Sequence, residues 1–186
     1  MNTDRNLEKI LKNFDFYSFD TLSSHKNNSI VLTFNNYIDV ATFSDIKYGG
    51  SEKDYIAQKE ILKTIIKEYI NSFDVEFLYL KKYSELWLIN EEICKELVYY
   101  MKANDINNNS KAMIVLRQAE PPFELFLDSL FMYNSFFQIL LPEERIIVSP
   151  TDHMDIFLDG DDISRVEKGL EKLEIEKYNV IKSYKN

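Results

Sequence analysis

Three apolar segments near the C-terminus constrain the fold of this chain more than any other feature. They run from about Phe136 to Leu141, from Arg145 to Ser149 and from Met154 to Asp159, and each has the length of a β-strand. They are joined by turns at Pro142-Glu143-Glu144 and Pro150-Thr151-Asp152, and short segments of this composition are typical of turns. The sequence therefore predicts an antiparallel β-meander in this part of the chain.

Helical periodicity predicts two helices, one before and one after these segments. Apolar residues at helical spacing predict a long helix after Gly49-Gly50 and a last helix from about Arg165 to Lys177. A capping box, Ser164-Arg165-Val166-Glu167, marks the start of that last helix, and Gly169 weakens it. Because strands occur both between helices and in adjacent hairpins, we expect an α+β fold with a mixed or mainly antiparallel sheet. Several packed helices and a C-terminal meander followed by a helix complete this expectation.

Shorter patterns predict the remaining elements. Three further helices are expected, from Asp4 to Phe14, after Asn90 and after Pro121-Pro122. Strand-like runs are expected at Ser29 to Phe34, Tyr37 to Ile46, Val75 to Leu80, Leu86 to Ile89 and Ala112 to Leu116. No repeat or linker divides the 186 residues, of which 45% are hydrophobic, so we expect residues 1–186 to form a single α+β domain.

The charge of the chain limits the partners that it can attract. Its formal net charge is −9 at pH 7 and its pI is about 4.8. A surface of this sign repels nucleic acid and anionic membranes, so we expect neither as a partner. It attracts basic proteins, although the same charge also serves solubility alone. The chain has four glycines and no glycine-rich phosphate loop, and we expect no cofactor.

Cysteine usage indicates a reducing compartment. Cys94 is the only cysteine, so one chain can form neither an internal disulfide nor a cysteine-based zinc site. Its position in a predicted helix favours an inert, half-buried thiol over an activated nucleophile. No segment has the character of a signal peptide, and no run of about 18 apolar residues occurs. We therefore expect a cytoplasmic protein, whose oligomeric state the sequence does not indicate.

Acidic residues gather around His153, one of the two histidines. If this segment is a strand, His153 and Asp155 point to one face, and Asp159 lies on that face further along. Imidazole and carboxylate groups bind divalent metals, so these residues are a candidate metal site. The alternative is structural, because Asp152 suits a turn and exposed strands often carry acidic residues. No nucleophile-elbow pattern surrounds any serine, and no catalytic residue is assigned.

Aromatic residues make up 14% of the chain, which is more than a small core must hold. Exposed tyrosine and tryptophan among carboxylates are typical of protein-binding surfaces, whereas the alternative is a core that is rich in aromatic residues. The candidate partner-binding residues are acidic residues of the meander and two aromatic anchors: Glu143, Glu144, Asp152, Asp155, Asp159, Trp87 and Tyr133.

In size, acidity, α+β build and a composition rich in Lys, Asn and Ile, the chain resembles the small acidic immunity proteins that bacteria keep in the cytosol. The resemblance implies a non-enzymatic protein-binding role, in which the chain neutralises a basic toxin, often a nuclease, by charge-complementary binding. It rests on no motif, so no functional residue is transferred. Two other functions stay open: a metal-dependent hydrolase that uses His153, Asp155 and Asp159, and a structural or adaptor subunit of a mobile-element assembly.

Overall fold

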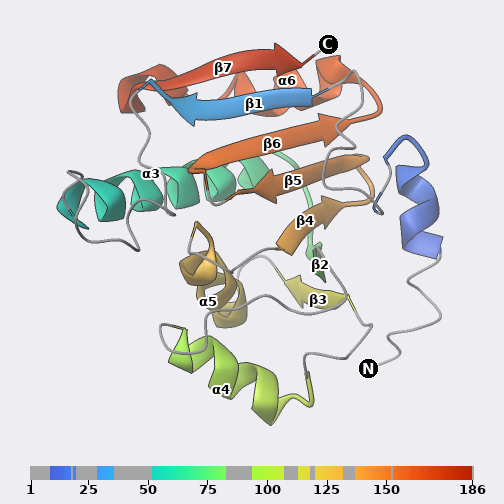
Figure 1. Cartoon of the computed structure of the whole chain (residues 1–186). Helices are drawn as coiled ribbons and strands as arrows, with labels where there is room; N and C mark the ends of the chain where they lie inside the picture. The colour runs from blue at the N-terminus through green and yellow to red at the C-terminus, as the bar shows by residue number, and fades with distance from the viewer. Residues whose placement is uncertain are drawn as a thin grey trace.

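The computed structural model describes residues 9–17, 19, 29–35, 52–82, 94–106, 113–117, 120–131, 137–151 and 153–185. Within these residues, seven strands form one sheet in the order β3-β2-β4-β5-β6-β1-β7, and every neighbouring pair is antiparallel (Figure 1). The strands are β1 (Ser29–Phe34), β2 (Phe77–Lys82), β3 (Ile114–Arg117), β4 (Phe137–Leu141), β5 (Ile146–Pro150), β6 (Asp155–Gly160) and β7 (Val180–Lys185).

Helices precede or follow several of these strands along the chain. They are η1 (Lys12–Phe14), α3 (Glu52–Asn71), α4 (Lys95–Ala103), α5 (Pro121–Ser129), α6 (Ile163–Leu170) and η2 (Ile175–Tyr178). The expected α+β fold is confirmed, including the C-terminal meander, which is β4-β5-β6, and the helix after it, which is α6. The strands expected at Tyr37 to Ile46 and Leu86 to Ile89 lie outside the described residues, as does the first part of the helix expected from Asp4.

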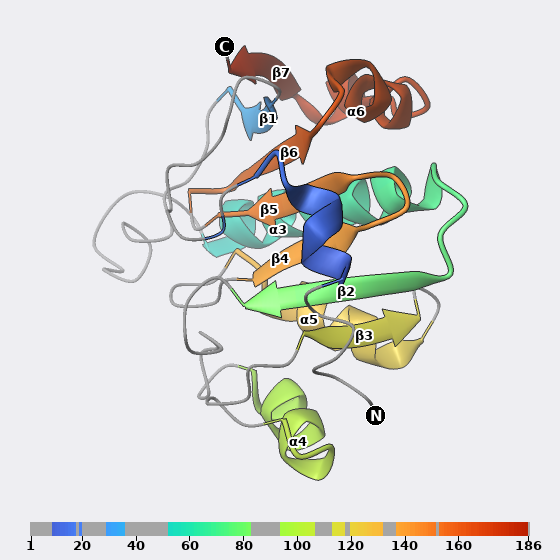
Figure 2. The same ribbon diagram turned by 90° about the vertical axis from the view of Figure 1, so that its right-hand side faces the viewer.

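The two faces of the sheet pack against different parts of the chain. One face carries alternate apolar residues such as Ile30, Leu80 and Ile139, and it forms the main core with α3, α5 and α6. On the other face, Leu140 and Ile147 contact Phe14 of η1 in a second, smaller cluster. Figure 2 shows this arrangement, with η1 in front of β4 and β5 and with α3 behind them. Both faces of the central strands are therefore covered, which explains why β4 and β5 are buried at every position.

The predicted stripe of α3 forms the centre of the main core. Leu62, Ile66, Tyr69 and Ile70 are buried almost completely, and Phe73 is partly buried against them. The spacing of these residues places them on one side of the helix, as expected for a helix that covers a sheet. Within the described residues, no helix is long and apolar enough to cross a membrane.

The C-terminal region differs from its prediction in two ways. The helix expected from Arg165 to Lys177 is present but shorter than predicted: α6 spans Ile163–Leu170, the short helix η2 follows, and the chain then forms β7. The N-cap of α6 is Asp162, whose side chain accepts a hydrogen bond of 2.9 Å from the backbone N–H of Ser164. Ser164 is therefore not the cap that its capping-box pattern predicts, because the aspartate two residues earlier takes that place.

Candidate protein-binding groove

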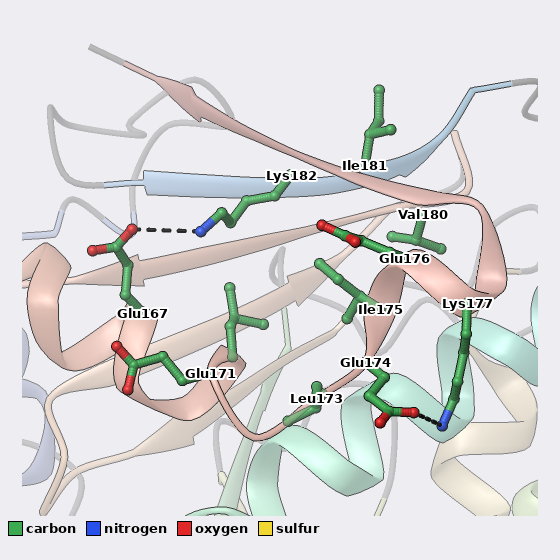
Figure 3. Close-up of a pocket in the computed structure, with 11 residues that line it drawn as sticks. Glu167, Glu171, Leu173, Glu174, Ile175, Glu176, Lys177, Val180, Ile181 and Lys182 are labelled. Atoms are coloured by element: carbon green, nitrogen blue, oxygen red, sulfur yellow. Dashed lines mark hydrogen bonds and ion pairs between the residues drawn. The ribbon is translucent and has the colours of Figure 1, made fainter.

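A hollow of about 730 Å³ lies between α6, η2 and β7 (Figure 3). Its apolar lining comes from Leu170 at the end of α6, from Leu173 and Ile175, and from Val180 at the start of β7. All four side chains are also buried in the main core, so they form a fixed floor. We call this hollow the C-terminal groove, and it has the size of pockets that bind small ligands or protruding side chains.

Backbone geometry after α6 shapes the C-terminal groove. The N–H of Leu173 donates to the carbonyl of Leu170 at 2.9 Å, which turns the chain away from the helix axis. At the end of η2, Asn179 has a φ of 58° and its N–H donates to the carbonyl of Glu176 at 3.0 Å. Asparagine tolerates this left-handed conformation better than most residues, and it allows the chain to reverse into β7.

Ion pairs close both ends of the C-terminal groove. At one end, Glu167 on α6 accepts a hydrogen bond from the hydroxyl of Tyr184 and lies 3.5 Å from the amino group of Lys182, both on β7. The Tyr184 hydrogen bond and the nearby Lys182 charge hold the pKa of Glu167 below its usual value. At the other end, Glu174 lies 3.6 Å from the amino group of Lys177. The Glu167 contacts join α6 to the last strand, whereas the Glu174–Lys177 pair lies within the η2 segment.

Two further glutamates face the C-terminal groove without such a partner. Glu171 lies on the α6 side and Glu176 on the β7 side, and both line the hollow in Figure 3. Neither forms an ion pair with the described lysines and arginines, whereas Glu167 and Glu174 do. The lining thus holds four glutamates and two lysines, which leaves an excess of two negative charges above an apolar floor. This combination suits a ligand that carries an aliphatic group next to a positive charge.

A second cluster of ionisable groups lies between α3 and α5, and its bonds are structural. Lys59 and Lys63 on α3 are 7% and 8% exposed. Lys59 donates to the backbone carbonyl of Asp128, while Lys63 pairs with the Asp128 carboxylate and with Glu60 at 3.0 Å. Burial and the neighbouring Lys63 charge lower the pKa of Lys59. Both lysines therefore stabilise the C-terminal end of α5, where helix carbonyls need donors.

Cys94 lies close to this cluster at the N-cap of α4. Its side chain is buried, and burial raises the pKa of the thiol above its ordinary value, although the charge of Lys59 opposes this effect. A thiol with a raised pKa is a poor nucleophile at neutral pH. The physical chemistry of Cys94 agrees with the inert role that its sequence context predicts.

The acidic residues predicted to bind a partner lie in different environments. Glu143 is exposed and Glu144 partly exposed in the turn between β4 and β5. Asp155 is partly buried and accepts a hydrogen bond from the hydroxyl of Thr151. Asp159 is only 2% exposed and accepts a hydrogen bond from the hydroxyl of Ser29 on β1, so its carboxylate lies inside the protein. Other members of the predicted set lie outside the described residues: Asp152, Trp87 and Tyr133.

The three predicted metal ligands lie in β6 or in the turn before it. His153 is exposed in the turn before this strand, whereas a strand position was expected for it. Asp155 and Asp159 do share one face of β6, at its two ends. Over the described ranges, no group of three or more His, Cys, Asp or Glu side chains is arranged to hold a metal ion.

Asp159→Ala should lower the free energy of unfolding by about 2 kcal/mol, because a buried hydrogen bond to a charged acceptor is lost. Urea denaturation of Asp159→Ala, Ser29→Ala and the double variant measures this effect. The double variant should lose less than the sum of the single variants, since both remove the same bond. A loss below about 0.5 kcal/mol in Asp159→Ala would instead indicate a solvated carboxylate.

In comparisons with protein-family models, with curated proteins and with solved structures, nothing matches this chain. The C-terminal groove is also a feature that the sequence did not single out. Its glutamates belong to the helix expected from Arg165 to Lys177. On such an amphipathic helix they are expected on the solvent-exposed face. A function must therefore be argued from the geometry and charge of the chain itself.

Proposed function

We propose that the chain is a non-enzymatic protein-binding domain, an immunity or antitoxin-like protein of the bacterial cytoplasm that neutralises a basic toxin. The observation that carries this proposal is the C-terminal groove, where Glu171 and Glu176 flank a buried apolar floor without a lysine or arginine partner among the described residues. An apolar centre with a charged rim is the usual anatomy of a protein interface.

The charge of the whole chain supports the same assignment. With a net charge of −9, the chain attracts a basic protein over several ångströms before contact and speeds its association. After contact, burial of an aliphatic side chain on the groove floor slows dissociation. The two effects are separable, because added salt weakens the first much more than the second.

Charge reversal in the groove should slow the association of the partner. Glu171→Lys with Glu176→Lys changes two charged residues by two units each, so the net charge rises from −9 to −5. Tagged wild type and variant are compared in capture from the native cell lysate at low and high salt, and the association rate of the captured basic protein is measured. We expect a fall in this rate of at least about tenfold at low salt for the groove variant.

Two matched variants distinguish binding in the groove from an effect of the net charge of the chain. Glu96→Lys with Glu120→Lys makes the same change of net charge at exposed positions that do not line the groove. Glu143→Lys with Glu144→Lys makes the same change of net charge in the turn between β4 and β5. This turn is the other candidate binding surface. Equal losses in all three variants would show that the binding depends on net charge alone. A loss confined to the Glu143 and Glu144 variant would move the binding site to that turn.

A further inference from the structure

The strand β7 lies at the end of the sheet and is paired on one side. It pairs with β1 over six consecutive positions, from Ser29↔Lys185 to Phe34↔Val180, and no other described strand pairs with it. All of its residues after Val180 are exposed. Figure 1 shows β7 at the outer edge, at the opposite end of the sheet from β3. A regular edge of this length offers backbone N–H and C=O groups to another strand.

Two of the devices that usually protect such an edge, a proline and a bulge, are absent from β7. Its sequence contains no proline, and its register with β1 runs without a bulge. The two lysines of the strand fold onto the faces of the sheet. Lys182 pairs with Glu167 at 3.5 Å, and the amino group of Lys185 lies 4.4 Å from the centre of the Phe157 ring. Their charges are therefore engaged on the two faces, away from the position of an added strand.

The edge of β7 that no described strand occupies and the C-terminal groove adjoin each other, since Val180, Ile181 and Lys182 belong to both. In an antiparallel or parallel pair, the side chain opposite Val180 or Lys182 points to the same face as these residues. That is the face on which α6 packs and on which the groove opens. An added strand would thus direct the two side chains opposite Val180 and Lys182 towards the groove.

We propose that the occupant of the C-terminal groove is an extended basic segment that pairs with β7 as an additional strand. This inference rests on the proposed protein-binding function and specifies how the partner binds. Alternate side chains of the segment enter the groove, an aliphatic one on the floor and a lysine or arginine at Glu171 or Glu176. The recognised pattern is therefore a basic residue, any residue, and an aliphatic residue. Main-chain hydrogen bonds give affinity, and the two groove positions give selectivity.

The test uses three synthetic peptides and the full chain. The first peptide is Lys-Thr-Val-Thr-Lys-Thr-Val-Thr with blocked ends, which presents lysine and valine on one face. The second has the same sequence with N-methyl groups on alternate backbone amides, so that one edge cannot donate hydrogen bonds. The third has glutamate in place of lysine. Binding is measured by fluorescence anisotropy, and backbone amide shifts locate the site.

The first peptide should bind and change the chemical shifts of the β7 backbone amides. Its affinity for the variant Glu171→Lys with Glu176→Lys should be at least tenfold lower than its affinity for the wild type. The N-methylated and glutamate peptides should each bind at least tenfold more weakly. Equal binding of the first two peptides in the groove would overturn strand addition and leave the proposed function standing. If no peptide binds, strand addition is overturned, while the lysate capture tests the proposed function independently.

Discussion

Gly169→Ala should destabilise the protein by about 2 kcal/mol, although alanine is the better helix former. Helix propensity alone predicts a gain of roughly 1 kcal/mol for this change within α6. The structure reverses the sign, because an added Cβ would lie 2.5 Å from Cε2 of Tyr69 and 2.6 Å from Cζ of Phe73. Contacts this short force α6 away from α3, and overpacking of a core costs about 1–3 kcal/mol.

The neighbours of Gly169 have little freedom to move. Tyr69 is 1% exposed, and its hydroxyl donates to the carbonyl of Val166 on α6 at 3.2 Å. Its ring also meets the Phe73 ring edge-on, with 5.3 Å between the centroids. The tyrosine that the new methyl group would strike is thus bonded to the same helix. Movement of α6 would break this hydrogen bond as well as open the interface.

Urea denaturation of Gly169→Ala, Phe73→Leu, their double variant and a control checks this prediction. Phe73→Leu removes the ring edge, so Gly169→Ala should cost less in the Phe73→Leu background than in the wild type, with a coupling of at least about 0.5 kcal/mol. Lys168→Ala is the matched control, since it changes an exposed residue of the same helix. A stability gain in Gly169→Ala similar to the propensity value would show that α6 does not pack this closely on α3.

The parts of the fold that could be predicted are those in which local pattern and burial agree. The runs that became β4 and β5 are mainly apolar because both faces of the sheet are covered there, and the turn between them is short. The strand β7 escaped prediction because only Val180 of its six residues is buried. An edge strand whose lysines rest on the faces of the sheet lacks the alternation that marks a strand.

The candidate sites show a similar limit. Strand periodicity placed Asp155 and Asp159 on one face of β6 correctly, but it could not reveal that Asp159 is buried. That burial depends on β1, whose Ser29 is 130 residues away in the sequence. The sequence predicts that Gly169 weakens the last helix, whereas in the structure it permits the close approach of α6 to α3. Long-range neighbours decide each of these roles.

Raising the pH above 10 should destabilise the wild type more steeply than Tyr55→Phe. The hydroxyl of Tyr55 donates to the carbonyl of Phe131 at 2.6 Å. Burial, and to a smaller degree the nearby Cys94, raises the pKa of Tyr55 from 10.0 to about 12. The pKa of Tyr69 is also raised, mainly by burial. Two phenols in the folded protein therefore keep protons that the unfolded chain loses near pH 10.

The sign of the effect follows from proton binding. The pKa of Tyr55 is higher in the folded state, so its contribution to stability is complete below pH 10 and is lost as the pH rises towards 12. Over that window the unfolded chain binds up to one proton fewer at this position. One proton corresponds to a slope of about 1.4 kcal/mol per pH unit. Tyr55→Phe removes this slope and leaves the corresponding contribution of Tyr69.

Urea denaturation of both proteins at pH 8, 10 and 11 measures this difference. At pH 8, Tyr55→Phe should be less stable by about 1–2 kcal/mol, because the buried carbonyl of Phe131 loses its donor. Above pH 10 the gap should narrow, since only the wild type loses the Tyr55 contribution. Tyr99→Phe removes an exposed phenol on α4 and serves as the control. A constant gap between the wild type and Tyr55→Phe at all three pH values would mean that Tyr55 ionises alike in the folded and unfolded chain, and it would overturn the expected pH dependence.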